Sequence, residues 1–275
     1  GATTGSLVVT LEALKEMHLT PEDIQLIQND TKTCPDTGMA GASRSLYMDG
    51  NATIIAANKL LAAMRKEDGT LRTYDEMKAE GIETKYLGRY ETNTTPGLCR
   101  LDPNTGIGDP TPAFTYCLNL AEVEVDTKTG KTTVLKFTCV DFVGRIGNID
   151  AVNGQAYSGI MHGIGFALKE DYADVKKHAN MFGAGTSYIK DVPDDINLIH
   201  IDGAISDGPF GSSGASEAFQ ASGHCAVLNG IYNACGVRIH EIPALPEKVK
   251  AGLDAIAKGE KPYEPKKYFL GSDML

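Results

Sequence analysis

The sequence predicts an α+β fold with helices and β-sheets mixed in two lobes, and three observations favour this class. Helical patterns of apolar residues recur along the chain. A clear β-hairpin pattern covers residues 118–140. The elements do not follow the regular strand–helix–strand order that a doubly wound sheet requires. With 275 residues, of which 42% are hydrophobic, the chain is long enough to bury a large core.

The first lobe, predicted over residues 1–110, is mainly helical. Two apolar helical faces are formed by Leu7, Leu11 and Leu14, and by Ala52, Ala56, Leu60 and Ala63. A short helix is predicted over residues 74–80, and residues 24–28 alternate like a strand. Residues 88–112 are rich in Gly and Pro, which favours a lobe boundary in this stretch.

The second lobe, predicted over residues 111–275, begins with the hairpin, whose turn lies at residues 126–130. A helix is predicted over residues 151–170, and strands over residues 186–190, 196–201 and 237–240. His200 and His240 lie in these strands and are expected to be structural. Two later helices have apolar faces formed by Leu228, Ile231, Tyr232 and Cys235, and by Val249, Leu253 and Ile256.

Charge and cysteine content narrow the class of protein. The net charge of −10 argues against nucleic acid or an anionic membrane as a partner. No apolar run has the length of a membrane span, and no signal peptide is recognised, so a cytoplasmic location is expected. The six cysteines form no C-x-x-C pair, so neither a zinc site nor a disulfide framework is predicted. The first residues, Gly-Ala-Thr-Thr-Gly, suggest a piece of a longer polypeptide.

A loop rich in Gly and Ser, residues 208–216, leads to Glu217 and a helical pattern. Ser213 or Ser216 is expected to cap that helix, which places Glu217 in or just before its first turn. Backbone N–H groups at such a position suit an anionic or oxygen-rich ligand, and a carboxylate among them is a candidate base. The alternative is that Glu217 is there only because the helix dipole favours acidic residues in a first turn.

Two further stretches resemble ligand-binding segments. The first comprises Ala40, Gly41, Ala42, Ser43, Arg44 and Ser45, whose small residues, hydroxyls and guanidinium suit phosphate. A surface turn with a solvated Arg44 is the alternative. The second is one face of the helix at 151–170, where Gln155, Gly159 and His162 align. Glycines inside a helix are unfavourable, so another helix or a ligand is expected to pack against this face.

Taken together, these stretches resemble the C-terminal half of the molybdopterin-binding domain of the xanthine oxidase and aldehyde oxidoreductase family. The stretches are residues 40–45, 154–165 and 208–217, and they occur in that order. The opening residues are similar to the end of that family's Gly-Gln-Gly motif. Residues 233–239 and 242–247 are similar to its closing signature. Within the family, the sequence is most similar to the bacterial aldehyde oxidoreductases.

The resemblance implies a molybdenum-dependent oxidoreductase and a role for each stretch. Residues 40–45 would hold the phosphates and pterin of a molybdopterin cytosine dinucleotide, which Gln155 and His162 would contact from their helix. The molybdenum would be held by the sulfurs of the cofactor and by no side chain. Glu217 would act as the base, accepting a proton as water-derived oxygen is added to an aldehyde to give a carboxylic acid. Electrons would leave through 2Fe–2S clusters.

The same resemblance implies partners. The upstream half of the molybdenum domain and an iron–sulfur domain or subunit would complete the enzyme, so the isolated piece is expected to be inactive; a homodimer is left open. Ser216 stands where many relatives have Gly, and no Pro follows Glu217 closely, which leaves substrate choice open. The alternatives are hydroxylation of purines or other N-heterocycles, a non-catalytic module that binds a cofactor or partner, and a metal-free enzyme that uses Glu217.

Overall fold

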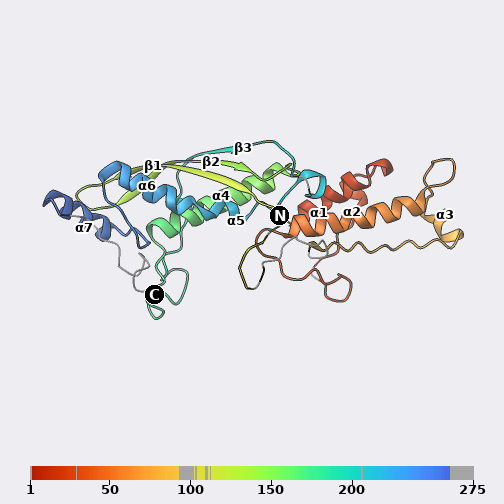
Figure 1. Cartoon of the computed structure of the whole chain (residues 1–275), viewed down its shortest axis with the longest axis horizontal. Coiled ribbons are helices and arrows are strands. Elements are labelled where there is room, and N and C mark those ends of the chain that lie inside the picture. The colour runs from red at the N-terminus through yellow and green to blue at the C-terminus, as the bar shows by residue number, and fades with distance from the viewer. Residues whose placement is uncertain are drawn as a thin grey trace. The chain divides into compact units, whose positions relative to one another are not determined.

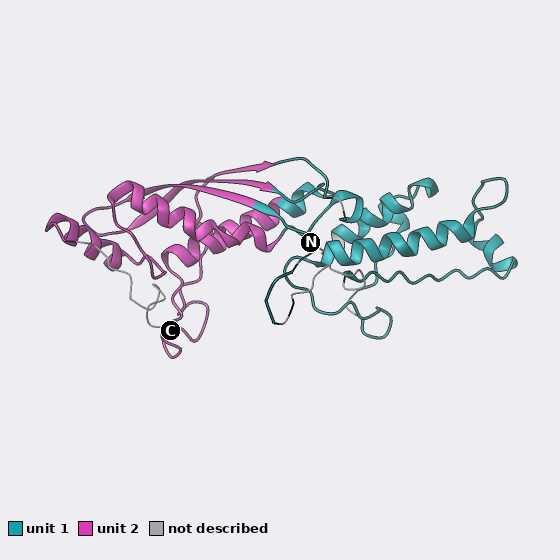
Figure 2. Cartoon of the chain, viewed as in Figure 1, with its two compact units in different colours: residues 1–116, 142–152, 201–215 teal, residues 117–141, 153–200, 216–275 magenta. Residues whose placement is uncertain are grey.

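The structure is a computed structural model that describes residues 2–28, 30–92, 102, 104–108, 111, 113–205 and 207–260. The chain forms two units (Figure 2). Unit 1 contains residues 1–116, 142–152 and 201–215, and unit 2 contains residues 117–141, 153–200 and 216–275. The units therefore interleave along the chain, whereas the sequence suggested consecutive lobes over 1–110 and 111–275. The expected boundary near residue 110 lies outside the described residues.

Unit 1 is built on two helices, α1 (Ala2–Ala13) and α2 (Ser45–Met64), which pack against each other (Figure 1). Leu14, Ala57 and Leu61 form the buried cluster at this contact. Both predicted helices are confirmed, but their predicted apolar faces only in part: Leu14 lies in this cluster and Leu60 packs against it. The other predicted face residues are only partly buried, namely Leu7, Leu11, Ala52, Ala56 and Ala63. Two 3₁₀ turns, Lys15–Met17 and Pro21–Asp23, follow α1.

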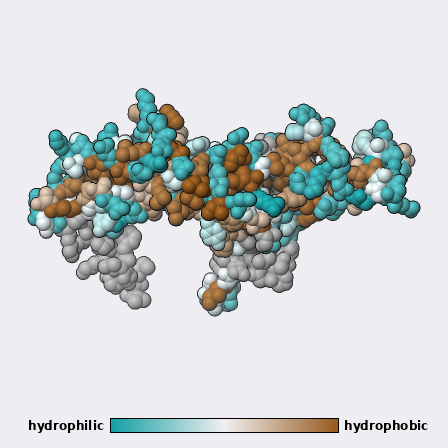
Figure 3. All heavy atoms as spheres, turned by 90° about the horizontal axis from the view of Figure 1, so that it is seen from above, coloured by the Kyte–Doolittle hydropathy of each residue, from teal (hydrophilic) through white to brown (hydrophobic). Residues whose placement is uncertain are grey.

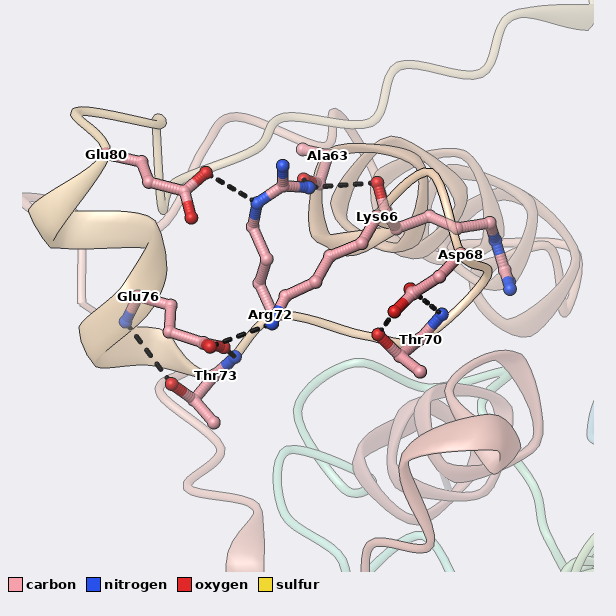
Figure 4. Close-up of polar contacts among 9 residues, drawn as sticks. Ala63, Lys66, Asp68, Thr70, Arg72, Thr73, Glu76 and Glu80 are labelled. Atoms are coloured by element: carbon pink, nitrogen blue, oxygen red, sulfur yellow. Dashed lines mark hydrogen bonds and ion pairs between the residues drawn. The ribbon is translucent and has the colours of Figure 1, made fainter.

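The end of α2 is tied to the short helix α3 (Tyr74–Ala79) by side-chain contacts (Figure 4). Arg72 donates from Nε to Glu80 at 2.7 Å and from Nη1 to the carbonyl of Ala63 at 3.4 Å. Thr73 Oγ1 accepts the backbone N–H of Glu76 at 3.2 Å, and the Glu76 carboxylate accepts the N–H of Thr73 at 2.7 Å. This capping box satisfies two N–H groups that the helix leaves unpaired, which explains why α3 begins at Tyr74.

Unit 2 contains the sheet, which has the order β1–β2–β3 (Figure 1). The strands are β1 (Tyr116–Val125), β2 (Thr132–Phe142) and β3 (Asp195–His200); only Tyr116 and Phe142 belong to unit 1. The predicted hairpin is confirmed, with Gly130 at a φ of 77° in its turn. β3 runs parallel to β2, and Cys139 pairs with Leu198 in the register. The mixture of helices with this sheet confirms the predicted α+β class.

Helices cover one face of the sheet. α4 (Ile149–Leu168) is followed in the chain by a 3₁₀ turn at Ile189–Asp191, then by α5 (Glu217–Ala221), α6 (Gly223–Cys235) and α7 (Pro246–Ala257). On the covered face, Phe137 and Cys139 of β2 are fully buried. On the other face, Leu118, Leu120 and Ile199 are 55%, 58% and 44% exposed. Hydrophobic atoms are visible at the surface on this side of the molecule (Figure 3).

Several further local predictions were wrong. Residues 24–28, 186–190 and 237–240 are not strands, because no neighbouring strand pairs with them in the described chain. Residues 189–191 form the 3₁₀ turn instead, and Val237 packs against Gly252 of α7. On α6 the buried side chains are Val227 and Ile231, whereas Tyr232, expected on the apolar face, is 44% exposed beneath the guanidinium of Arg238. On α7, Ile256 was expected on the apolar face and is 40% exposed.

Candidate functional site

The loop at residues 40–45 has an unusual backbone. Ala42 and Ser43 have φ values of 51° and 57°, a region that side chains other than glycine and asparagine rarely adopt. Arg44 then donates its N–H to the carbonyl of Gly41 at 3.2 Å, and α2 begins at Ser45. Two consecutive left-handed residues are unfavourable by about 1–2 kcal/mol each, so the surrounding structure must hold the loop.

Residues 207–214 pack against this loop and against the first half of α2. Asn51 of α2 donates to the carbonyl of Asp207 at 3.0 Å. A Cβ on Gly50 would stand 2.7 Å from Cγ of Pro209, and a Cβ on Gly214 would stand 1.7 Å from the carbonyl oxygen of Ser43. The glycines therefore allow the two segments to approach, and the structure brings together two of the stretches that the sequence singled out.

The segment at 207–214 is itself anchored by backbone contacts in unit 1. Ser212 Oγ donates to the carbonyl of Arg145 at 2.7 Å, and the N–H of Arg145 is bonded to Gly211 at 2.9 Å. Ser213 donates its N–H to Val143 at 3.0 Å. Ser213 is thus held against residues 143–145 and caps no helix. These bonds join residues 211–213, next to the residue 40–45 loop, to residues 143–145.

The loop presents mainly hydrogen-bond donors. The guanidinium of Arg44 is exposed, and the first turn of α2 has N–H groups without intrahelical partners. Asp49, one turn into α2, is half-buried; burial raises the pKa of its carboxyl, and the charge of Arg44 lowers it to a smaller extent. Donors, a cation and a helix N-terminus form a set that suits phosphate or another anion.

In unit 2, α4 and the α5–α6 segment are in close contact. A Cβ on Gly159 would stand 2.5 Å from Cβ of Phe219, and a Cβ on Gly163 would stand 2.9 Å from Cα of Gly223. The expectation that something packs against this face of α4 is confirmed, and it is a helix. Gln155 and His162 lie on either side of Gly159 along the helix and are half-buried.

Glu217 is the first residue of α5, a helix of five residues, and its side chain is exposed. Ser216 precedes it as the N-cap residue but makes no side-chain capping bond. Phe219, two residues later, is fully buried against Gly159. The short helix is thus fixed to α4 by one aromatic side chain while Glu217 remains accessible to solvent.

The predicted site residues therefore fall into two clusters. In unit 1, residues 40–45 lie against residues 207–214; in unit 2, Gln155 and His162 lie on the helix that packs against α5, which begins with Glu217. The chain passes from one cluster to the other at the peptide bond between Ala215 and Ser216.

One polar group was missed from the sequence. His200 is bonded through Nδ1 to Asp141 at 2.7 Å and through Nε2 to Asn153 at 2.8 Å, which confirms that it is structural. Asp141 carries no sequence signal of its own, although strand alternation places it on the same face as Phe137 and Cys139.

Two negative findings apply to the described residues. No group of three or more His, Cys, Asp or Glu side chains is arranged to hold a metal ion, and no helix has both the length and the hydropathy of a membrane span.

An α+β chain with a donor-rich loop at one helix N-terminus and an accessible carboxylate at another has the form of a cofactor-binding domain. The family model of the molybdopterin cofactor-binding domain matches residues 1–193. The chain therefore belongs to the molybdopterin cofactor-binding domain family.

Individual relatives support this assignment. The chain is 42% identical over 255 residues to an aldehyde oxidoreductase from Megalodesulfovibrio gigas, covering 93% of this chain and 28% of that protein. It is 28% identical over 264 residues to a probable hypoxanthine oxidase from Escherichia coli, covering 90% of this chain. Crystal structures of aldehyde oxidoreductases superpose with TM-scores of 0.85 (Desulfovibrio desulfuricans, 45% identity, 90% of this chain and 27% of that one) and 0.87 (Desulfovibrio gigas, 41%, 92% and 28%). The chain thus spans just over a quarter of these relatives.

Proposed function

We propose that this chain is part of a molybdenum-dependent oxidoreductase that converts aldehydes to carboxylic acids, with the added oxygen coming from water. The observation that carries this proposal is the 42% identity to an aldehyde oxidoreductase, maintained over 93% of the chain. Identity to the probable hypoxanthine oxidase is lower, at 28% over a similar length.

In the proposed cofactor site, residues 40–45 bind the phosphates of a molybdopterin cytosine dinucleotide. The strained backbone at Ala42 and Ser43 and the support from Gly214 favour this role, because they fix the donors before the ligand arrives. Arg44 supplies a fixed positive charge for a phosphate. Gln155 and His162 contact the pterin from α4. When bound, the cofactor supplies the metal centre at which the substrate is oxidised.

Glu217 is the proposed general base. Its carboxylate is exposed at the start of α5, where it can accept a proton as oxygen is added to the substrate. Phe219 holds α5 against α4 and so limits the positions that Glu217 can take. Ser216, beside Glu217, is where this chain departs from the pattern of many relatives. We therefore assign the substrate only as a small aldehyde.

The remaining parts of the enzyme are also proposals. The upstream half of the molybdenum domain and a domain or subunit with 2Fe–2S clusters would complete the cofactor site and carry electrons away. Because the chain spans only 28% of the M. gigas relative, these parts have ample length in such a protein. We propose that the complete enzyme acts in the cytoplasm.

A second candidate function is hydroxylation of a purine or a related N-heterocycle. It is favoured by the similarity to the probable hypoxanthine oxidase, which extends over 90% of this chain. The two candidates differ in substrate and share the base and the cofactor, so turnover of aldehydes and of hypoxanthine by the same preparation separates them.

The test is Glu217→Gln in the full-length protein to which this chain is proposed to belong, called the parent protein below. Glu247→Gln is the matched control. Glu247 is also exposed in the first turn of a helix, α7, so this control reproduces the charge change at a comparable position. Glu217→Gln should lower aldehyde turnover by about 10²-fold or more while molybdenum and pterin content stay unchanged. Equal turnover in the two variants would remove Glu217 as the base. A preparation that contains no molybdenum or pterin would favour a non-catalytic binding module.

A further inference from the structure

Two cysteine thiols face each other inside the sheet of unit 2. Cys117 lies on β1 and Cys139 on β2, and their Sγ atoms are 3.4 Å apart. Both are free thiols; Cys139 is fully buried and Cys117 is half-buried. They are 22 residues apart in the sequence, so no short cysteine motif predicts that they are neighbours.

The two sulfurs are in direct contact. Cys117 and Cys139 lie on adjacent strands, and only the 3.4 Å between their Sγ atoms separates the side chains. A disulfide bond is about 2.0 Å long, so the sulfurs have to approach by a little over 1 Å. The proposed bond therefore requires the two side chains to rotate toward each other.

The two thiols also differ in reactivity. The hydrogen bond between them lowers the pKa of Cys117, whereas the same bond and burial raise the pKa of Cys139. The thiolate is the form that reacts with oxidants, and Cys117 is the more accessible of the two. We therefore expect an oxidant to react first with Cys117, and the neighbouring thiol of Cys139 to react with the oxidised Cys117.

The pair is connected to the segment that carries Glu217. Cys117 Sγ donates to Oδ1 of Asn119 at 3.7 Å, and Nδ2 of Asn119 donates to Oγ of Ser222 at 2.9 Å. Ser222 lies between α5 and α6, directly after the helix that Glu217 begins. The thiol of Cys117 thus helps to orient the side chain that holds this junction.

We propose that Cys117 and Cys139 are a reversible dithiol–disulfide site, oxidised by a peroxide, whose disulfide form weakens the hydrogen bond from Asn119 to Ser222. The peroxide converts Cys117 to a sulfenic acid and releases one water; the thiol of Cys139 then displaces a second water as the S–S bond forms. Overall, two thiols and one peroxide give one disulfide and two waters. A thiol reductant reverses the reaction by exchange. In the disulfide, Cys117 has no S–H group to donate to Asn119.

The first test treats the parent protein with hydrogen peroxide and maps its peptides without reduction. A linked pair of peptides containing Cys117 and Cys139 should appear, and a thiol reductant should remove it. Cys117→Ser and Cys139→Ser should each abolish the link, while Cys225→Ser, which removes an exposed thiol, should leave it intact. Cys117→Ala serves where serine prevents folding. Two free thiols after treatment, or Cys117 oxidised without a link to Cys139, would overturn the proposal.

The second test follows backbone hydrogen exchange in the same protein. Amides of residues 222–226 should exchange about fivefold faster in the oxidised form, the factor expected for one lost hydrogen bond of ordinary strength. Asn119→Ala should produce the same change in the reduced protein, and α7 should exchange alike in all forms. Identical exchange of residues 222–226 before and after oxidation would overturn the link to Ser222. These readouts do not depend on turnover, so the proposed enzyme activity can fail while this site stands.

Discussion

Nδ1 of His200 on β3 lies 2.7 Å from Oδ2 of Asp141 on β2, and the two residues are register partners in the parallel pair of strands. Asp141 is only 1% exposed, and its second oxygen, Oδ1, is buried without a hydrogen-bond partner in the described residues. Nε2 of His200 is bonded to Oδ1 of Asn153 on α4. A series of hydrogen bonds thus connects the sheet to α4 inside the core of unit 2.

The buried carboxyl of Asp141 in this series of hydrogen bonds predicts a pH dependence of the free energy of unfolding. Burial raises the pKa of Asp141 above the ordinary value of 3.8, and the charge of His200 offsets only part of that effect. A raised pKa means that the folded state binds the proton more tightly than the unfolded state. The contribution to stability is therefore complete below pH 3.8 and is lost as the pH rises through the raised pKa of Asp141.

Asp141→Asn should remove this dependence, because the amide carries no charge at any pH. Relative to this variant, the wild type should lose free energy of unfolding as the pH rises through the raised pKa. Urea unfolding at a series of pH values measures the difference. Asp202→Asn, an exposed change, should follow the wild type throughout. Parallel curves for the wild type and Asp141→Asn would show that the carboxyl keeps its proton affinity on folding.

Two glycines of α4 predict opposite effects of the same substitution. A Cβ at Gly159 would lie 2.5 Å from Cβ of Phe219 and 2.7 Å from its carbonyl carbon, whereas a Cβ at Gly154 meets nothing within 4 Å. Gly159→Ala should lower the free energy of unfolding by about 1–3 kcal/mol through overpacking. Gly154→Ala should raise it by about 0.5–1 kcal/mol, because alanine favours the helix. Thermal or urea unfolding measures both, and a stabilising Gly159→Ala would contradict the close packing of α4 and α5.

The regular elements with strong local signals were predictable from sequence. The hairpin, α2, α4 and α7 have clear periodic patterns of apolar residues, and each of these elements forms where its pattern predicts it. Residues 24–28 and 237–240 failed because a strand requires a partner, which a local pattern does not reveal. Tyr232 was expected on the buried face of α6, but the aromatic ring is covered by Arg238, a contact that spacing alone does not show.

The candidate site was predictable in part for the same reason. Small residues at 40–45 and at 208–216 were noticed, and the contact of Gly214 with Ser43 shows why glycine is needed there. The sequence did not show that Gly159 makes room for Phe219, because that contact joins segments 60 residues apart. Cys117 and Cys139 were interpreted as scattered thiols, since only the strand pairing brings their sulfurs to 3.4 Å.

A capping box predicts the stability of the segment after α2. Thr73 accepts the N–H of Glu76, and Glu76 accepts the N–H of Thr73 (Figure 4). Thr73→Ala should lower the free energy of unfolding by about 1 kcal/mol and increase hydrogen exchange in α3. Thr84→Ala, at an exposed position outside any helix, is the control and should have no measurable effect. Unchanged exchange in α3 after Thr73→Ala would show that packing of Met77, which is 2% exposed, suffices to hold the helix.

The two arginines at the ends of α2 provide a matched pair for the proposed cofactor site. Arg44 precedes the helix at its N-terminus, and Arg65 follows it at the C-terminus, where it is bonded to Glu16 at 2.6 Å. If Arg44 binds a cofactor phosphate, Arg44→Ala removes a charge-assisted hydrogen bond, and affinity for the dinucleotide should fall by about tenfold or more. Arg65→Ala should leave affinity unchanged, because it removes an exposed ion pair and one bond to the carbonyl of Gly69, both at the opposite end of α2. Pterin content of the parent protein after gel filtration measures both.

Equal retention in the two variants would mean that Arg44 is a solvated surface residue and that the phosphates bind elsewhere. Arg44→Lys should recover only part of the loss, because an ammonium group keeps the charge without the planar pair of donors.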